Sequence, residues 1–414
     1  MPLIFFAIKL MEYFRGVFYV LILASARNAA SPIFHLYLGE NTVQSVSSDP
    51  VCSYLLFTVP SIILQQWQSE TKIISAEYMC SLRPKEPQIS MESLIMDRLA
   101  LVTRNTDEIV TPEELEALLS SDSTCSAYVG YEPSGKIHMG HVLTVNKLLD
   151  LQQAGFKITV LLADIHAYLN EKGTMEEVKK IADYNRRCFI ALGLDEKNTD
   201  FVLGSSYQLE PDYMMDVLKL ARSTTLNRAR RSMDEVSRDA ENPKVSQMIY
   251  PLMQALDIAH LRVKVAVGGI DQRKTHMLAR EGLPELGYSA PVCIHTPILL
   301  GLDGKKMSSS KGNYISVDDS PEDIRKKMKG AFCVEGEVRD NPVLSLFKYH
   351  IMPRYPEIAV KRPEKYGGDL HYSGYEAIEA DFAARRLHPM DLKSAASEYM
   401  NQILEPVRRL MQEK

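Results

Sequence analysis

The chain has 414 residues, of which 45% are hydrophobic and 24% are charged, as in a globular protein with two or three domains. Its 48 basic and 53 acidic residues give a formal net charge of −5, which excludes a histone-like polycation but allows a local basic face for nucleic acid. The six cysteines are scattered without a C-x-x-C pair. A disulfide scaffold or a structural zinc site is therefore not expected. The scattered cysteines favour a location in the reducing cytoplasm.

The first 90 residues differ in composition from the rest, because they carry only 12 charged side chains and show no repeat. The apolar stretch 16–24 resembles a signal-peptide core, or a membrane helix too short for the roughly 20 residues that a span requires. The mixed charges of Lys9, Glu12 and Arg15 weaken the signal-peptide interpretation. The favoured alternative is an extension without readable function, upstream of a true first residue at Met91 or Met96.

From about residue 96, helix and strand patterns alternate. Residues 111–114 (Thr-Pro-Glu-Glu) predict a capped helix start. A second helix follows the turn 132–135 and stops at Gly155, and another runs from Thr174 to Gly193. Strands are expected at 127–131, 158–163, 201–203 and 263–267. This order predicts an α/β fold with a Rossmann-like open parallel sheet, whose ligands bind at the carboxyl ends of the strands.

After about residue 320 the pattern becomes helical. Ser320 and Pro321 start one helix, and residues 390–411 repeat apolar side chains at spacings of three and four. A second, helical domain is therefore expected at 321–414.

The first informative motif lies at 133–141. His138 and His141 share one face of the first helical turn after a strand and a glycine-containing turn. A helix N-terminus favours phosphate, and imidazoles there can donate hydrogen bonds to phosphate oxygens. Gly140 leaves room for a flat group such as adenine. Alone, the motif could also be a helix start with two surface histidines.

The second motif is the glycine-punctuated loop 301–312, which is rich in lysine and hydroxyl groups. Such a loop can close over polyphosphate, where lysine neutralises developing charge and serines donate hydrogen bonds. Alone, it could be a solvated turn. It follows the histidine pair by about 170 residues, where the second half of a site is expected, and the joint pattern is much less expected by chance than either part.

The two motifs resemble the HIGH and KMSKS signatures of class I aminoacyl-tRNA synthetases, at 138–141 (His-Met-Gly-His) and 306–310 (Lys-Met-Ser-Ser-Ser). Residues 96–414 are similar to the tyrosyl-tRNA synthetase family of archaeal and eukaryotic type, without the extra C-terminal domain common in eukaryotic forms. Met139 replaces the usual isoleucine or leucine. Ser310 stands where many members have a second lysine, whose phosphate role passes to Lys306, Lys311 or serine hydroxyls.

The resemblance implies a class I catalytic domain at 96–320, with an inserted region for dimer and acceptor-stem contacts, and a helical anticodon-binding domain at 321–414. It assigns catalysis to His138, His141, Lys306 and Ser309. It assigns ATP binding to Gly140, Gly269, Asp271, Ser308 and Ser309. A glycine lets the backbone approach a nucleotide, and a carboxylate such as Asp271 accepts from ribose hydroxyls.

A third set of residues concerns the amino acid. Tyr250, Gln254 and Asp257 lie on one side of a helix by their spacing, and a pocket that satisfies a phenol can reject phenylalanine by about 10⁵. The resemblance implies that Tyr128 and Asp257 hold the tyrosine hydroxyl, whereas Tyr250, Gln254 and Gln272 hold the amino group. Ordinary packing is the alternative for Tyr250 and Gln254. The packing alternative is less favoured for Asp257, because burying an unpaired carboxylate is costly in free energy.

Basic clusters at 227–231, 273–274 and 325–329 would let an acidic chain hold tRNA, although the last is interpreted as a solvated face. The resemblance implies two groups of tRNA contacts: acceptor-stem contacts of Arg231, Arg273 and Lys274, and anticodon contacts of Tyr366, His388 and Asp391. An exposed aromatic ring can stack on an unpaired base, and a carboxylate can accept from guanine.

The expected function is that of a cytoplasmic, homodimeric tyrosine–tRNA ligase that uses L-tyrosine, tRNA(Tyr) and ATP with its Mg²⁺, without a protein-held metal or a membrane partner. Three alternative functions share some of these features. A tryptophanyl-tRNA synthetase is disfavoured by Asp257 with Tyr128. Small-metabolite adenylyltransferases are usually shorter and lack a helical anticodon domain. A catalytically idle RNA-binding paralogue is disfavoured by the intact motifs.

Overall fold

The computed structural model describes residues 91–121, 124–233, 244–307 and 311–412, together with the backbone of four short strands before residue 90. The chain divides into two compact units, Met1–Gln88 and Ile89–Lys414. In the first unit, β1 (Val20–Leu23) pairs antiparallel with β2 (His35–Leu38), and β3 (Gln44–Val46) pairs antiparallel with β4 (Tyr54–Leu56). Apart from β1, the apolar stretch 16–24 and its interpretation as a signal peptide lie outside the described residues.

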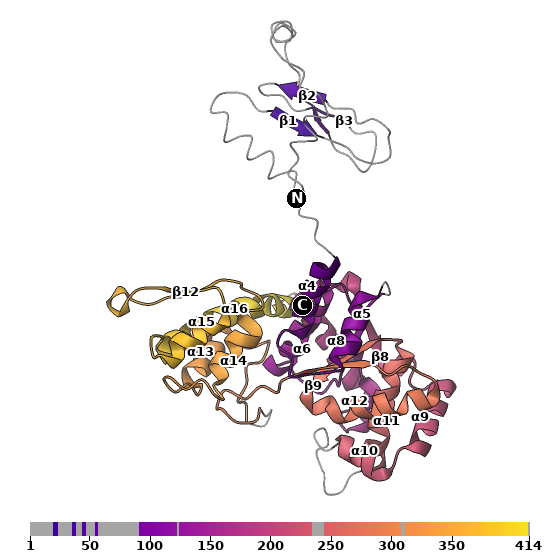
Figure 1. Cartoon of the computed structure of the whole chain (residues 1–414). Coiled ribbons are helices and arrows are strands. Elements are labelled where there is room, and N and C mark those ends of the chain that lie inside the picture. The colour runs from indigo at the N-terminus through magenta and orange to yellow at the C-terminus, as the bar shows by residue number, and fades with distance from the viewer. Residues whose placement is uncertain are drawn as a thin grey trace. The chain divides into compact units, whose positions relative to one another are not determined.

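The second unit is built on a six-stranded sheet, of which β8 and β9 are labelled in Figure 1. The strand order is β5–β10–β9–β6–β7–β8. Its strands are β5 (Glu108–Val110), β6 (Ser126–Tyr131), β7 (Lys157–Leu162), β8 (Thr199–Leu203), β9 (Val265–Gly269) and β10 (Val292–Thr296). The strands β10, β9, β6, β7 and β8 are parallel, whereas β5 is antiparallel to β10 at one edge. The predicted α/β open sheet is thus confirmed. The predicted strands are offset by up to two residues, and β5 and β10 were not predicted.

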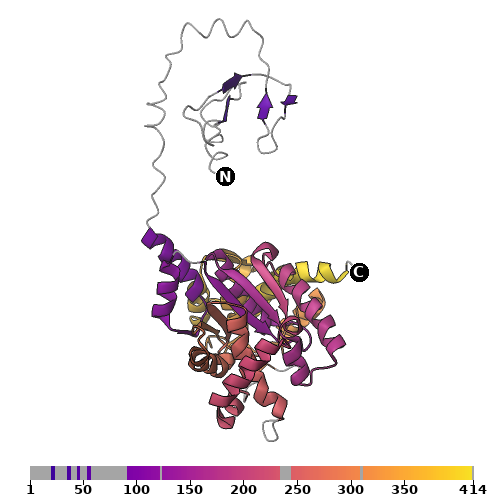
Figure 2. The same ribbon diagram turned by 90° about the vertical axis from the view of Figure 1, so that its right-hand side faces the viewer.

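Helices cover both faces of this sheet (Figure 2). Side chains alternate along a strand, so Ala127 and Val129 of β6 pack in one core cluster, and Tyr128 packs in the other. The first cluster includes buried side chains of α4 (Met91–Thr103), α5 (Pro112–Ser120), α6 (Met139–Gln153) and α8 (Met175–Ala191). The second includes side chains of α7 (Asp164–Leu169), α9 (Pro211–Ser223), α11 (Val245–His260) and α12 (Arg273–Gly282). The helix α10 (Leu226–Met233) packs against α11 and α12.

The predicted helix starts are confirmed by their capping contacts. Thr111 Oγ1 accepts from Glu114 N at 3.3 Å, and the Glu114 carboxylate accepts from Thr111 N, which is a capping box. Thr174 makes the same box for α8. Ser320 caps α13 (Pro321–Gly330), which begins with a proline as expected.

The region after residue 320 is mostly helical, as predicted. It contains α13, α14 (Pro342–Leu346), the π-helical turn η5 (Phe347–Ile351), α15 (Tyr375–Ala383) and α16 (Pro389–Gln412). It also contains β11 (Ile358–Val360) and β12 (Leu370–Tyr372), an antiparallel pair that was not predicted. Three-residue strands are too short to show a period-2 pattern. The domain boundary at 320 stays a prediction, since contacts group both regions in the unit Ile89–Lys414.

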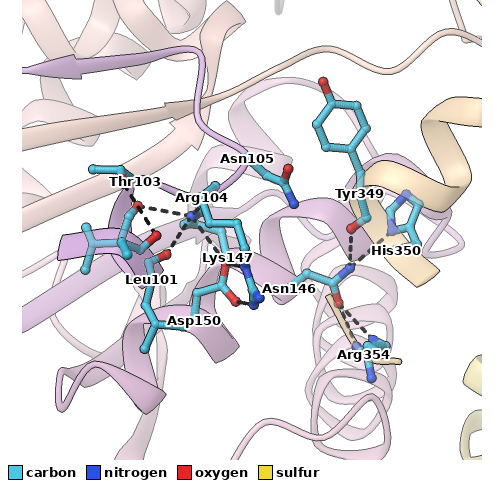
Figure 3. Close-up of polar contacts among 12 residues, drawn as sticks. Leu101, Thr103, Arg104, Asn105, Asn146, Lys147, Asp150, Tyr349, His350 and Arg354 are labelled. Carbon is cyan, nitrogen blue, oxygen red and sulfur yellow. Dashed lines mark hydrogen bonds and ion pairs between the residues drawn. The ribbon is translucent and has the colours of Figure 1, made fainter. Parts of the chain in front are cut away.

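The middle of α6 joins the sheet region to the helices that follow (Figure 3). Asn146 Nδ2 donates to Tyr349 O at 2.9 Å, and Asn146 Oδ1 accepts from Arg354 Nη2 at 2.7 Å. The next residue, Lys147, turns toward the end of α4 and donates to Val102 O at 3.1 Å. The helix that begins with the histidine motif is therefore fixed on both sides by buried hydrogen bonds. Among the described residues, no helix combines the length and apolar character that crossing a bilayer requires.

Candidate active site

The two sequence motifs meet at the start of α6. The segment 315–317 follows the lysine-rich loop and pairs with residues 137–139. Met139 N donates to Ile315 O at 3.1 Å, and Val317 N donates to Ile137 O at 3.0 Å. Backbone hydrogen bonds therefore join motifs that are about 170 residues apart in the chain.

The histidine pair is held in one protonation state. His138 is the N-cap of α6, and its Nδ1 accepts from Gly140 N at 3.2 Å; His141 Nδ1 accepts from His138 N at 3.2 Å. Burial lowers the pKa of His138 to about 4, and burial with the adjacent His138 lowers the pKa of His141 to about 3. Both rings are neutral near pH 7. Because each Nδ1 is an acceptor, each proton lies on Nε2, which can donate to a ligand oxygen.

Gly140 leaves open the space between the two motifs. A Cβ atom added there would lie 3.0 Å from the His138 ring and 3.7 Å from Met307 Sδ. A larger residue would fill this gap, so the glycine keeps the helix start accessible to a ligand.

The lysine-rich loop is closed at its base by Asn313. Its Nδ2 donates to Asp303 Oδ1 at 2.7 Å and to Lys306 O at 3.2 Å. Lys306 lines the pocket described next. The predicted Ser308 and Ser309 lie outside the described residues, so their roles stay predictions.

A pocket of about 410 Å³ opens at the carboxyl ends of β6, β9 and β10, beside the start of α6. All the described residues that were predicted for catalysis, ATP or tyrosine line it: Tyr128, His138, Gly140, His141, Tyr250, Gln254, Asp257, Gly269, Asp271, Gln272 and Lys306. The fold therefore brings together residues from four separate segments at the edge where open parallel sheets bind ligands.

At one end of the pocket, Asp257 is 0% exposed and uses its two oxygens differently. Oδ1 accepts from Tyr207 OH at 2.7 Å, Gln208 Nε2 at 2.8 Å and Tyr213 OH at 2.8 Å. Oδ2 has no hydrogen-bond partner among the described residues, and neither does the buried hydroxyl of Tyr128. Burial, followed by the charge of Asp257, raises the pKa of Tyr128, which stays a neutral phenol. A donor and an acceptor are thus both left open, as a tyrosine hydroxyl requires.

His166 stands beside this unpaired oxygen. Its Nε2 is buried without a hydrogen-bond partner, 3.7 Å from Asp257 Oδ2, and its ring packs edge-on against Tyr250 at 4.5 Å between centroids. Among the described residues that line the pocket, those with an unpaired buried side-chain atom are Tyr128, His166 and Asp257, and the other two surround Asp257.

A second polar group surrounds Tyr250 and Glu132. Tyr250 OH donates to Glu132 Oε2 at 3.2 Å, and Glu132 also accepts from Asn170 Nδ2 at 2.9 Å and from Lys172 Nζ at 3.1 Å. Glu132 directly follows β6 and lines the pocket. A carboxylate and a phenol placed together can receive an ammonium group.

Gln254 and Gln272 meet across the pocket, since Gln254 Nε2 donates to Gln272 Oε1 at 3.1 Å. Gln272 Nε2 in turn donates to Asp271 Oδ2 at 2.9 Å. A Cβ atom added at Gly269 would lie 2.2 Å from Asp271 Oδ1, so only glycine lets Asp271 fold back over the turn.

Sequence reasoning missed five residues of this site: Glu132, His166, Tyr207, Gln208 and Tyr213. The signal in the sequence that could have identified them is their position after predicted strands. Glu132, His166 and the run 207–213 each follow a strand of the sheet closely, where ligand-binding side chains concentrate.

The residues predicted to contact tRNA do not line the pocket. Arg231 lies on α10 and donates to Asn227 O at 3.3 Å. Arg273 starts α12 and donates to both oxygens of Glu108, at 2.9 and 2.8 Å. Lys274 is exposed next to it.

The three predicted anticodon residues lie in the C-terminal region. Tyr366 is 62% exposed, with Lys365 Nζ 4.8 Å from its ring centroid. His388 caps α16, because its Nδ1 accepts from Met390 N at 3.2 Å. Asp391 lies in the first turn of α16 and makes no side-chain cap bond in the described structure.

Comparison with known proteins identifies the family of the chain. The family model described as "tRNA synthetases class I (W and Y)" matches residues 120–405. The chain therefore belongs to the class I tRNA synthetases. A tyrosine–tRNA ligase from Methanosarcina mazei is 68% identical over 316 residues, which are 76% of this chain and 100% of that protein. Within its class, the chain is a tyrosine–tRNA ligase.

Solved structures place the chain in the same group. Tyrosyl-tRNA synthetase from Archaeoglobus fulgidus, complexed with L-tyrosine, has a TM-score of 0.75 and 64% identity, over 76% of this chain and 99% of that one. A tryptophanyl-tRNA synthetase from Aeropyrum pernix has a TM-score of 0.59 and 25% identity, over 73% of this chain and 82% of that one. The tryptophan alternative is not favoured.

Proposed function

We propose that the pocket at the start of α6 carries out both steps of tyrosine–tRNA ligation. The tyrosine carboxylate attacks the α-phosphate of ATP, forming tyrosyl-adenylate and releasing pyrophosphate. A hydroxyl of the terminal ribose of tRNA(Tyr) then takes the tyrosyl group and releases AMP. Since little acid–base chemistry is needed, positioning and charge stabilisation carry the catalysis.

The observation that carries this proposal is the pair of unpaired buried groups, Asp257 Oδ2 and the hydroxyl of Tyr128. A buried polar group without a partner costs about 1–3 kcal/mol, and this pair lines the pocket, so it fits a ligand group that supplies both a donor and an acceptor. The hydroxyl of tyrosine both donates and accepts, and it would donate to Asp257 and accept from Tyr128. Phenylalanine would leave both groups unpaired, and tryptophan presents an N–H that can only donate.

The ammonium of tyrosine would lie among Tyr250, Gln254 and Gln272, which meet at the other side of the pocket. The Glu132 carboxylate, which accepts from Tyr250 OH and also pairs with Lys172 Nζ, adds acceptor oxygens there. Opposite charge and hydrogen-bond acceptors favour an ammonium group over a neutral substituent.

The phosphates of ATP would lie at the start of α6. The Nε2–H groups of His138 and His141 donate to phosphate oxygens, and the helix N-terminus adds backbone N–H groups. Lys306 neutralises charge on the departing pyrophosphate. The adenine packs over Gly140, and Asp271 accepts from the ribose. Mg²⁺ would arrive as part of the ATP substrate. Among the described residues, no group of three or more His, Cys, Asp or Glu side chains is arranged so that it could hold a metal ion.

We infer that tRNA(Tyr) reaches two surfaces. Arg231, Arg273 and Lys274 would contact the acceptor stem beside the pocket. In the C-terminal region, Tyr366 would stack on an anticodon base while Asp391 accepts from guanine. The exposure of Tyr366 supports this, because an aromatic ring that is 62% exposed is accessible to a base and can bury apolar surface when it stacks.

We further propose a homodimer in the cytoplasm. The stretch from η2 (Gly204–Ser206) to the start of α10 carries four exposed large apolar side chains, Leu209, Met215, Leu218 and Leu226, at 52–70% exposure. Exposed apolar side chains of this kind suit a surface that a second subunit covers. The described cysteines Cys125, Cys188, Cys293 and Cys333 are not joined in disulfides among the described residues, which suits a reducing compartment.

Tyrosine-dependent exchange of pyrophosphate into ATP tests the first step, and charging of tRNA(Tyr) tests the second. Exchange is expected with tyrosine and not with tryptophan, and with phenylalanine lower by about 10⁵ in kcat/KM. Exchange that tryptophan supports as well as tyrosine would contradict the assignment of the pocket.

A further inference from the structure

A chain of polar side chains, of which the two histidines are buried, lies behind the turn that carries Gln272. Arg273 Nε donates to both oxygens of Glu108, and Glu108 Oε2 lies 2.9 Å from His295 Nδ1. His295 Nε2 lies 3.0 Å from His276 Nδ1, and the two rings stack with centroids 5.1 Å apart. His295 is 0% and His276 is 1% exposed. Glu108, His295 and His276 do not line the pocket, and the reaction proposed above does not use them.

The protons of this Glu108–His295–His276 chain follow from its geometry. Burial raises the pKa of Glu108, but hydrogen bonds and charges from Arg273 and His295 outweigh it and lower the pKa, so Glu108 is a carboxylate. His295 must therefore carry its proton on Nδ1. Burial lowers the pKa of His295 despite the opposing effect of Glu108, which leaves its Nε2 unprotonated. His276 must then donate from Nδ1, and its own pKa is lowered to about 3 by burial.

The side chains of this Glu108–His295–His276 chain contact the turn at the end of β9. Arg273 directly follows Gln272, and His276 follows one helical turn later. A Cβ atom added at Gly268 would lie 3.0 Å from Gln272 Cβ and 3.1 Å from His276 Cε1, so both side chains pack on this glycine. The turn is thus tied from both ends to the neighbouring strands: His295 comes from β10 and Glu108 from β5.

We propose that His276 is a positioning residue for tyrosine activation, which holds Gln272 where its carboxamide meets the substrate ammonium. This inference rests on the proposed role of Gln272. A glutamine side chain has three rotatable bonds, and fixing it before the substrate arrives removes an entropy loss on binding. The Oε1 atom of Gln272 accepts from Gln254, and its Nε2 donates to Asp271, but these two hydrogen bonds orient only the end of the side chain. His276 fixes the backbone turn from which it extends.

The test compares two ligands that differ only in the ammonium group. Calorimetry on the full chain measures the binding of L-tyrosine and of 3-(4-hydroxyphenyl)propanoate, which lacks that group. In His276→Ala, tyrosine should bind about 10-fold more weakly, as expected for one hydrogen bond to a charged group, and the analogue should change less than about 2-fold. His276→Asn retains an amide N–H near the Nδ1 position and should restore most of the loss.

A matched control is His350→Ala. His350 is also a 0% exposed neutral imidazole, with Nδ1 3.2 Å from Asn146 Nδ2, but it lies outside the pocket lining (Figure 3). Its removal leaves a similar cavity, so it should lower thermal stability without changing the ratio of the two affinities.

Gln272→Ala separates this inference from the function on which it rests. If Gln272→Ala leaves the affinity ratio unchanged, the ammonium role of Gln272 is wrong. If Gln272→Ala lowers the ratio while His276→Ala leaves it unchanged, or weakens both ligands equally, the positioning role is overturned. Should His276→Ala not fold, Glu108→Gln breaks the chain at a residue with a 30% exposed side chain. The same selective loss, about 3-fold, is expected there, and its absence would also overturn the inference.

Discussion

Asp257, which we propose contacts the substrate hydroxyl, is held by hydrogen bonds on one of its two oxygens. Its Oδ1 accepts three hydrogen bonds, from Tyr207, Gln208 and Tyr213, and these fix the plane of the carboxylate. Its Oδ2 is left for the pocket. A buried carboxylate is costly unless hydrogen-bonded, and the three donors offset that cost before a substrate binds.

Replacing Asp257 therefore tests the pocket directly. Asp257→Ala should lose about 2–4 kcal/mol of transition-state stabilisation for tyrosine, because the substrate hydroxyl and three protein donors lose their acceptor. Steady-state pyrophosphate exchange measures this as kcat/KM. Asp257→Asn is the matched variant: it retains an acceptor for the donors but can place an amide nitrogen at Oδ2, and should chiefly reduce discrimination against phenylalanine. An unchanged kcat/KM for tyrosine in both variants would refute the assignment.

Asp391 tests a residue that acts far from the chemistry. Asp391→Ala removes the proposed acceptor for guanine at the first anticodon base, so tRNA charging should fall about 10-fold to 100-fold, the cost of a lost base contact. Tyrosine-dependent pyrophosphate exchange should stay near wild type, since Asp391 does not line the pocket.

The alternative for Asp391 was a helix cap. His388 supplies that cap in the structure, so Asp391→Ala should change stability little. Charging is compared on transcripts that vary the first anticodon base, with Glu398→Ala as an exposed control on the same helix. A mutant that prefers the same base as strongly as wild type would disprove the anticodon role.

Among the elements, α6 combines two tasks. Its first turn presents His138 and His141, whereas its middle buries Asn146, Lys147 and Asp150 at 2–5% exposure (Figure 3). Buried polar groups must be paired, and here they pair with other elements: Lys147 and Asp150 with the end of α4, and Asn146 with η5 and Arg354. The motif at the start of α6 is thereby placed by contacts near its middle.

Lys147 provides the test of this element. Lys147→Met keeps much of the side-chain volume but leaves Val102 O and neighbouring carbonyls unpaired, and removes the ion pair with Asp150 at 3.4 Å. Breaking a buried pair in this way should cost about 3–5 kcal/mol in the free energy of unfolding, measured with urea. Lys180→Met removes an exposed ion pair with Glu176 and should change it by less than about 1 kcal/mol. Equal effects of the two variants would rule out a structural role for Lys147.

At the scale of the whole molecule, buried histidines make stability depend on pH. Burial lowers the pKa of His276 and of His350 to about 3, with smaller effects of His295 and Arg354. An unfolded histidine titrates near 6.5. Between about pH 6.5 and 3, the unfolded chain binds protons that the folded chain does not. Stability therefore falls as the pH falls through this range.

His350→Asn measures one contribution. From pH 7 to pH 5, the wild type should lose about 2 kcal/mol more unfolding free energy than the variant, because 1.5 pH units below an unfolded pKa of 6.5 correspond to about that energy. Urea unfolding at both pH values gives the difference. If both proteins lose the same stability, His350 is protonated in the folded state, contrary to this account.

Local chemistry in the sequence was sufficient for much of this protein. The capping residues Thr111, Thr174 and Ser320 set helix starts that the structure confirms, because a cap depends on residues within one turn. The apolar runs of β6 and β7 identified central parallel strands. The two motifs and Asp257 identified the class of site, since phosphate and phenol each demand particular side chains.

Tertiary structure alone decided which partners those residues have. Tyr207, Gln208 and Tyr213 reach Asp257 from at least 44 residues away, and Glu108 reaches His295 across 187. No local pattern encodes such pairs, because their side chains meet only where the sheet brings separate strand ends to one edge. The short strands β5, β11 and β12 were also not predicted. Three residues carry too little pattern of their own, and these segments are strands because they pair with neighbouring strands. The sequence by itself determined the chemistry of the site; the fold determined its geometry, because burial and hydrogen bonding between distant segments exist only in the assembled core.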